Sequence, residues 1–390
     1  MKNQSHAVNL EVWLSSLLTI AIALTVGIVV LNLLWANYSP PFPMPKVLPA
    51  ITAPVDGPFY LLNAEHGYDW NPNDRLSLWF HPLMSYLVRF MPSWFPSNIW
   101  FWLISVTFAI GSILLTAQLT SIVGTLKGVP YMLLPLILLA PGGLEIATGN
   151  AEIPTLFFAL GLLLSVLQWQ KWWLTILFAG LAILTKPNAL YMVPVLLVYF
   201  ISGLFERNNK LWVQALIGIL ALLIVWVMWI WYVDWKTRVP GTYWSLRELS
   251  SLYEAQDAPG FLDHLARSFL DGNDIQDQLR YSVALIIPIA NLWMVGFIPM
   301  LRERDRNAIV AGNLAMLAIA LFMGNPNKII VYTTTLPGNF VMHILFIEKL
   351  LTRGSFSNSF LRFGIAALYA TYCIAMLIFY MLGTPLGWYY

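Results

Sequence analysis

Charged residues and cysteine are scarce in this sequence. Only 10% of the 390 residues are charged, and 21 basic against 19 acidic side chains leave a formal net charge of +2. The basic residues are scattered along the chain, so the sequence offers no patch suited to nucleic acid. The single cysteine, Cys373, excludes an intrachain disulfide and a cysteine-based metal cluster.

Apolar runs, by contrast, are long and frequent, since 59% of the residues are hydrophobic. The run from Val12 to Trp35 contains no charge and exceeds the roughly 20 residues that a helix needs to cross a bilayer. It is too long for a signal-peptide core, and no small-residue cleavage site follows it, so we interpret it as a retained signal anchor. The chain is therefore expected to be an integral, multi-pass membrane protein.

The apolar runs predict an all-α polytopic fold in which residues 1–390 form a single transmembrane domain of about 11 helices. The predicted spans lie near residues 12–36, 98–123, 129–146, 153–169, 172–185, 188–205, 211–233, 281–301, 308–323, 331–350 and 362–383.

The distribution of positive charge predicts the topology. Short connections on one side of the predicted bundle hold most of the lysines and arginines, and this side is expected to be cytoplasmic together with the N-terminus. These residues are Lys2, Lys127, Lys171, Arg207, Lys210, Arg302, Arg304, Arg306, Lys349, Arg353 and Arg362. The two long loops, 37–97 and 234–280, then face the extracytoplasmic side.

Asp56 stands out in the first outer loop. It follows a proline-rich spacer at 39–45 and precedes two predicted interfacial helices, 57–66 and 76–91. An aspartate before Gly-Pro and an apolar run is a good helix N-cap, and a carboxylate fixed at a helix start is also well placed for chemistry. The sequence leaves both interpretations of Asp56 open.

Further polar residues gather on the same predicted face. Lys186 and Lys328 lie in tight outer connections, where a lysine either contacts a phosphate or extends to the lipid headgroups. Glu152 opens a predicted span. The segment 271–277 resembles a calcium loop only superficially, because it lacks the terminal glutamate, so no metal site is predicted.

Several short motifs resemble the GT-C superfamily of integral membrane glycosyltransferases, in particular its mannosyltransferase type. They are Asp56 followed by Tyr60, Ala64 and Gly67-Tyr68; Phe80-His81-Pro82-Leu83 leading into a helix; Gly149-Asn150-Ala151-Glu152; and the stretch 179–187 ending in Lys186-Pro187. The resemblance covers about the first 205 residues.

The resemblance implies transfer of a sugar from a polyprenyl-phosphate donor to a lipid or glycan acceptor at the outer face, with inversion at the anomeric carbon. It assigns Asp56 as the general base, which takes a proton from the attacking hydroxyl. It implies donor-phosphate contacts from Lys186, with Lys328, Arg247 and His81 as further candidates. No cofactor is predicted, and the sequence leaves metal dependence open. Candidate acceptor or sugar contacts are Tyr60, Glu65, His66, Tyr68, Asp69, Asn150 and Glu152.

Two other classes of protein fit parts of the pattern. A lipid-linked-sugar flippase or secondary transporter would place charges or broken helices inside the spans of two repeated halves. A surface-polysaccharide polymerase or ligase would carry a large basic outer loop, whereas loop 234–280 is mixed in sign. Because the predicted spans are nearly free of charge, the sequence favours chemistry at the outer surface over transport.

Overall fold

The structure, a computed structural model, describes most of the chain between residues 57 and 373. The described residues are 57–68, 78, 80–90, 92, 94–123, 151–244, 275–298, 301–323, 336–351 and 364–373, with four residues between 14 and 21.

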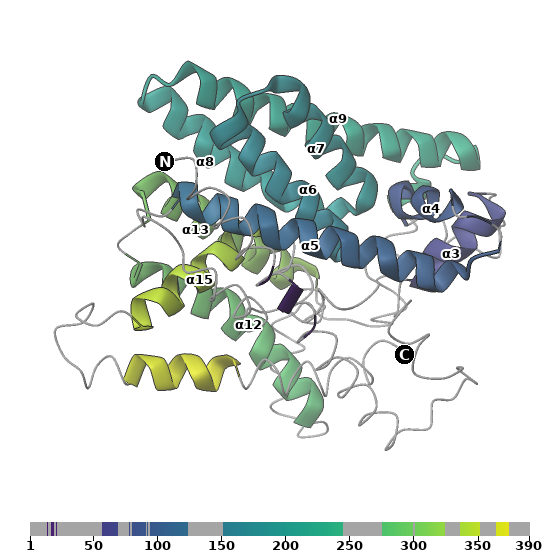
Figure 1. Cartoon of the computed structure of the whole chain (residues 1–390). Coiled ribbons are helices and arrows are strands. Elements are labelled where there is room, and N and C mark those ends of the chain that lie inside the picture. The colour runs from purple at the N-terminus through teal and green to yellow at the C-terminus, as the bar shows by residue number, and fades with distance from the viewer. Residues whose placement is uncertain are drawn as a thin grey trace.

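Every regular element among these described residues is a helix (Figure 1). The elements are α3 (Gly57–His66), α4 (Pro82–Arg89), α5 (Ser97–Val123), α6 (Glu152–Leu164), α7 (Trp172–Thr185), α8 (Met192–Phe205), α9 (Asn209–Thr237), α12 (Ile275–Gly296), α13 (Glu303–Met323) and α15 (Pro337–Leu351), with a π-helical turn at Ser165–Trp169, a 3₁₀ helix at Pro187–Tyr191 and a further helix at Gly364–Cys373.

Four of the described helices are long and apolar enough to cross a membrane. They run over Ile99–Val123, Glu152–Trp169, Pro187–Phe205 and Asn209–Thr237. The prediction of an α-helical membrane protein is confirmed to this extent. Eleven crossings stay a prediction, because nearly all of span 12–36 and the whole of span 129–146 lie outside the described residues.

The observed helix bounds match the predicted ones best where proline or glycine marks the end of a helix. The helix predicted at 172–185 is α7 without change, and the helix predicted at 57–66 is α3. The helix predicted at 76–91 is shorter, because α4 begins only at Pro82 and ends at Arg89. Proline suits a first helical turn, since its missing N–H has no helical partner there.

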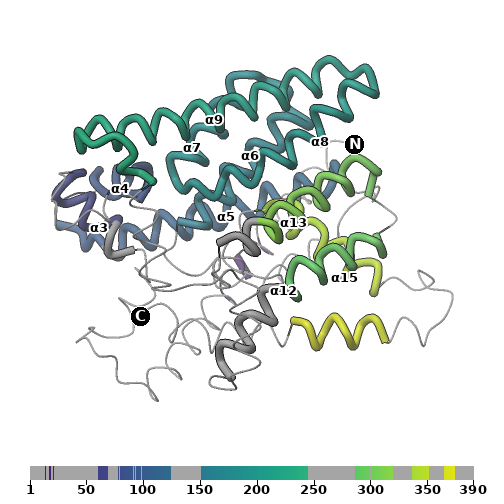
Figure 2. The backbone as a smooth tube through the Cα atoms, turned by 180° about the vertical axis from the view of Figure 1, so that it is seen from behind, coloured from purple at the N-terminus to yellow at the C-terminus, as the bar shows by residue number. Residues whose placement is uncertain are grey.

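Helices α6 to α9 form a closely connected group, with α7 in contact with both α6 and α9 (Figure 2). The chain reverses between α6 and α7 through the π-helical turn and Gln170, which adopts a left-handed φ of 50°. Inside the group, the Thr175 hydroxyl donates to Gln214 at 2.7 Å and lies 3.0 Å from the Ser165 hydroxyl. Such bonds fix the register of apolar helices, because lipid offers no alternative partner.

The two short helices that precede α5 are packed into the protein. Figure 1 shows α3 and α4 beside the start of α5 and near the end of α9. The Tyr60 side chain is 1% exposed, with its ring 5.2 Å from Phe80 and 5.9 Å from Phe101. These helices therefore have a buried side against the bundle, which holds the segment after Asp56 at one end of the molecule.

Candidate functional site

A buried ion pair joins the start of α6 to the end of α7. The Glu152 side chain is fully buried, the Lys186 side chain is 16% exposed, and the Lys186 Nζ contacts Glu152 Oε1. The sequence placed both residues on the same face, and the structure brings them into contact. Removing either partner would leave an uncompensated charge in a poorly hydrated site, so the pair holds the two helix ends together.

His81 completes this junction from the start of α4. Its Nδ1–H donates to the carbonyl oxygen of Ile183 in the last turn of α7. In a continuing helix that carbonyl would accept from residue 187, but Pro187 has no N–H. His81 therefore supplies the donor that proline lacks, from a position 102 residues earlier in the chain.

The surroundings of His81 keep its ring neutral. Burial, opposed by the Ile183 hydrogen bond and assisted by the positive charge of Lys186, lowers the pKa of His81 to about 4. With Nδ1 protonated, Nε2 carries the free lone pair, and within the described part of the chain this buried atom has no hydrogen-bond partner. The ring lies 5.2 Å from that of Trp229 on α9. We assign this histidine a role in joining α4 to α7.

A polar pocket of about 300 Å³ opens next to this junction, between α3, α4 and the end of α9. Its described lining consists of Asn63, His66, Gly67, Tyr68, Ser85, Tyr86, Arg89, Tyr232 and Lys236. The side chains of Asn63, Tyr68 and Ser85 are buried and form its floor, whereas His66 and Arg89 are exposed at its rim.

Tyr68 links the pocket to the buried junction. Its hydroxyl donates to the carbonyl of Phe80 at 2.8 Å, one residue before His81. Burial raises the pKa of Tyr68 above its ordinary value, outweighing the hydrogen bonds to Ser85 and Asn63, so the phenol stays protonated. Its ring also meets Trp229 edge to face at 5.8 Å, so Trp229 contacts both His81 and Tyr68.

The structure distributes the predicted site residues over different environments. His66 and Tyr68 line the pocket, while Tyr60 is buried in the packing of α3 against α5. Glu65 points to solvent, with 57% of its side chain exposed, and lies 3.9 Å from His66. The predicted residues that lie outside the described part of the chain are Asp56, Asp69, Asn150, Arg247 and Lys328.

No sequence pattern singles out Arg89 and Lys236. Each is a basic residue in the last turn of a helix, which the helix dipole favours in any protein. Lys236 also lay beyond the predicted end of its span at residue 233. One basic residue at a helix end does not indicate a binding site. The two residues suggest a site only because the structure brings both helix ends to one pocket.

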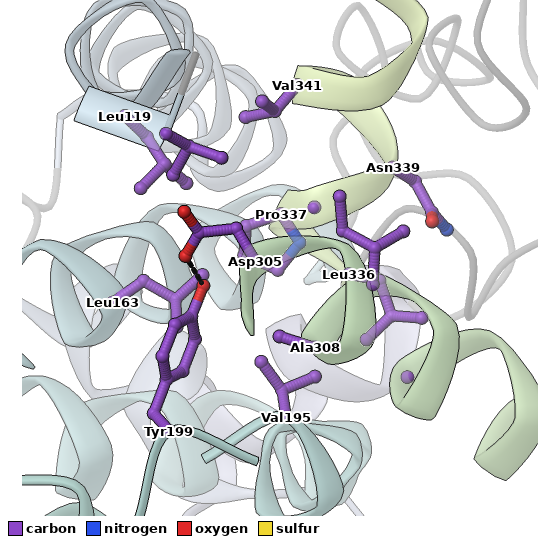
Figure 3. Close-up of a pocket in the computed structure, with 14 residues that line it drawn as sticks. Leu119, Leu163, Val195, Tyr199, Asp305, Ala308, Leu336, Pro337, Asn339 and Val341 are labelled. Carbon is purple, nitrogen blue, oxygen red and sulfur yellow. Dashed lines mark hydrogen bonds between the residues drawn. The ribbon is translucent and has the colours of Figure 1, made fainter. Parts of the chain in front are cut away.

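A second cavity lies at the far end of α5, where Leu119 and Val123 are in its wall (Figure 3). It has room for about one water molecule, with a volume of about 20 Å³, and its lining is largely apolar. The Tyr199 hydroxyl donates to Asp305 Oδ1 at 2.9 Å at its edge, which joins α8 to α13. This cavity offers no room for a substrate.

The described residues contain no group of three or more His, Cys, Asp or Glu side chains arranged to hold a metal ion. This statement covers only those residues, and much of the segments 37–97 and 234–280 lies beyond them.

Comparison with known proteins gives a distant structural likeness. No family model matches the chain, and no curated protein is similar to it. Among solved structures, it is similar to the archaeal oligosaccharyltransferase AglB from Archaeoglobus fulgidus, solved with an inhibitory peptide and a dolichol-phosphate. The TM-score is 0.48 at 14% identity, over 95% of this chain and 56% of that protein. A likeness of this extent defines neither family nor activity, and this chain spans about half of that protein's length.

Proposed function

We propose that this protein is a membrane glycosyltransferase that moves a sugar from a polyprenyl-phosphate donor to a lipid or glycan acceptor at the extracytoplasmic face of the membrane. The observation that carries the proposal is the polar pocket at one end of an apolar helical bundle. A pocket of about 300 Å³ is at the lower end of the range for small-molecule sites. Its tyrosine, amide and hydroxyl groups suit a sugar, whose faces pack on aromatic rings and whose hydroxyl groups need partners.

Asp56 is the proposed general base. It directly precedes α3, and the last turn of α3 supplies Asn63 and His66 to the pocket. An acceptor hydroxyl must lose a proton as it attacks the anomeric carbon, and a carboxylate at the start of α3 is suited to receive it. The bond from the anomeric carbon to the donor phosphate breaks in the same step, which inverts the configuration at that carbon.

Lys186 has a narrower role in this proposal than the sequence suggested. Its ammonium group already contacts the buried Glu152 carboxylate, so its charge is largely compensated in this structure. The pair holds the ends of α6 and α7 together. His81 bonds to the end of α7 and its ring lies against Trp229, which also contacts Tyr68 in the pocket lining. Direct contact between Lys186 and a donor phosphate stays a prediction.

The test uses the full-length protein in lipid vesicles with a labelled polyprenyl-phosphate sugar. We expect Asp56→Asn to lower the transfer rate about 100-fold or more, because loss of a positioned base removes roughly 10²- to 10⁴-fold of rate. The matched control is Glu303→Gln, which also removes one carboxylate but lies at the exposed start of α13.

Wild-type transfer by Asp56→Asn, at normal levels of inserted protein, would exclude Asp56 as the base. Movement of the lipid-linked sugar across the vesicle membrane without any transfer would exclude the glycosyltransferase and favour a flippase.

A further inference from the structure

We propose that the pocket between α3, α4 and α9 is an anion site in which Arg89 and Lys236 bind the phosphate group of a membrane lipid. Identification of that lipid as the sugar donor rests on the proposed function, whereas the phosphate site itself rests on the pocket.

The described lining of the pocket is basic. Arg89 comes from α4 and Lys236 from α9, and His66 adds a third basic side chain from α3. None of the described residues that line the pocket carries a carboxylate. Arginine presents a planar fork of donors and lysine a compact charge, and phosphate oxygens accept hydrogen bonds from both. The lining therefore fits an anion with several acceptor oxygens.

The nearest carboxylate on α9 is engaged elsewhere. Asp234 Oδ2 accepts the backbone N–H of Gly241 at 2.9 Å, and Oδ1 accepts that of Tyr243 at 3.4 Å. These bonds close the turn after α9, where Arg238 adopts a left-handed φ of 56°. Asp234 thus stabilises the chain reversal and is absent from the described pocket lining.

Helix dipoles explain part of this arrangement and leave the rest unexplained. His66, Arg89 and Lys236 each lie in the last turn of a helix, where the negative end of the dipole favours a basic side chain. The same dipole would act equally on cations at separate helix ends. It gives no reason for three helix ends to converge on one open pocket.

A glycine forms the turn that brings α3 to the pocket. Gly67 has a φ of +74°, a conformation that residues with a side chain rarely adopt. A Cβ there would lie 3.9 Å from an Arg89 guanidinium nitrogen, which is an ordinary contact distance. The backbone of this turn therefore requires glycine, and the turn lies beside the guanidinium group.

Exposed aromatic residues flank the two cations. Phe90, directly after Arg89, is 83% exposed, and Trp235, directly before Lys236, is 62% exposed. Trp231, one turn earlier on α9, is 64% exposed and stacks on Trp235. Exposed tryptophans at the end of an apolar helix are typical of the lipid headgroup level. The cations thus lie where the phosphate of a membrane lipid would reach them, so a lipid is favoured over a soluble anion.

The experiment measures binding of a polyprenyl monophosphate to the full-length protein in phosphatidylcholine nanodiscs. We expect Arg89→Gln and Lys236→Gln each to weaken binding about tenfold, the loss of roughly one charge-assisted contact, and the double variant to weaken it more. Arg89→Lys should restore part of the affinity. The matched control is Lys210→Gln, which removes the same charge from the first turn of α9 at the opposite end of that helix.

Wild-type affinity in the double variant, with an unchanged melting temperature, would overturn the phosphate site. An equal loss in Lys210→Gln would also overturn it, because the effect would then follow net charge alone. A preference for a lipid carboxylate over a lipid phosphate would replace phosphate by another anion and likewise reject the proposal.

Two further measurements distinguish a lipid phosphate from free phosphate, and the sugar donor from other phospholipids. Competition by inorganic phosphate alone, without binding of lipid phosphates, would overturn the membrane-lipid assignment. Equal binding of phosphatidic acid would uphold the phosphate site and reject its assignment to the donor. Asp56→Asn protein that binds normally but does not transfer sugar supports both proposals. If wild-type protein binds the lipid but transfers no sugar, the proposed function fails and the phosphate site stands.

Discussion

The two ends of the described bundle use polar groups in different ways. At the end with α3 and α4, the polar residues surround an open pocket of about 300 Å³ that holds two cations and three tyrosines. At the opposite end, Tyr199 and Asp305 bond to each other beside a cavity of about 20 Å³. Both ends contain buried hydroxyl groups, but only the first leaves space around them.

Polar groups that join helices bond to each other, whereas polar groups at a binding site face open space. The Tyr199–Asp305 bond joins α8 to α13, and the nearby Arg304 bonds Glu206 at 3.0 Å across the same helix ends. Asp305 and Glu206 thus each accept a hydrogen bond from a neighbouring helix. At the pocket, the described lining holds an arginine and a lysine and no carboxylate, and there we propose an external anion.

The largest expected effect on stability is at the buried pair of the pocket end. Glu152→Gln leaves the Lys186 charge poorly compensated, and we expect a loss of about 3 kcal/mol in the free energy of unfolding. Equilibrium unfolding in lipid bicelles would measure this loss. The control is Glu206→Gln at the opposite end, where a half-exposed pair should contribute less than about 1 kcal/mol. Equal losses in the two variants would remove the distinction between the ends.

His81 should make the pocket end sensitive to acid. Its folded pKa is about 4 against an ordinary 6.5, so the unfolded chain binds the proton first as the pH falls. The stability contributed by neutral His81 is complete above pH 6.5 and decreases down to about pH 4, by about 3 kcal/mol in total. Unfolding measured between these values should show a steeper pH dependence in wild type than in His81→Phe. Parallel curves would show that His81 is not buried as described.

A smaller effect is expected from Tyr199→Phe at the opposite end. Loss of its hydrogen bond to Asp305 should cost about 2 kcal/mol of stability, since the bond involves a charged acceptor. Affinity for a lipid phosphate should not change, because this bond lies at the other end of α5. Parallel measurements of unfolding and lipid binding on one preparation would test both statements. Loss of binding in a stable Tyr199→Phe protein would show that the two ends are coupled.

The helices were predictable because their signals are local. The bounds of α7 follow from an apolar run between Lys171 and Lys186-Pro187, and α3 follows from Gly57-Pro58 before an apolar segment. Contacts between distant helices were not predictable in this way. The interaction of His81 with Ile183 crosses 102 residues, and no spacing in the sequence encodes it.

The candidate site was predictable in part. Tyr68 was selected from a motif and lines the pocket, as does His66, which was a candidate contact outside the motif. Tyr60, from the same motif as Tyr68, packs against Phe101 instead. A helical motif cannot tell which of its faces meets solvent and which meets a neighbouring helix. Arg89 and Lys236 were missed for a related reason, since each alone has the ordinary place of a cation at a helix end.

The sequence alone identifies a helical membrane protein with few charges, because apolar runs of spanning length form helices in a bilayer whatever the rest of the fold is. It does not tell which charged groups lie near each other. In the folded protein Lys186 contacts Glu152, while Arg89 and Lys236 line one pocket. The environment of a charge depends on distances in space, and the packing of α3, α4, α7 and α9 sets these distances.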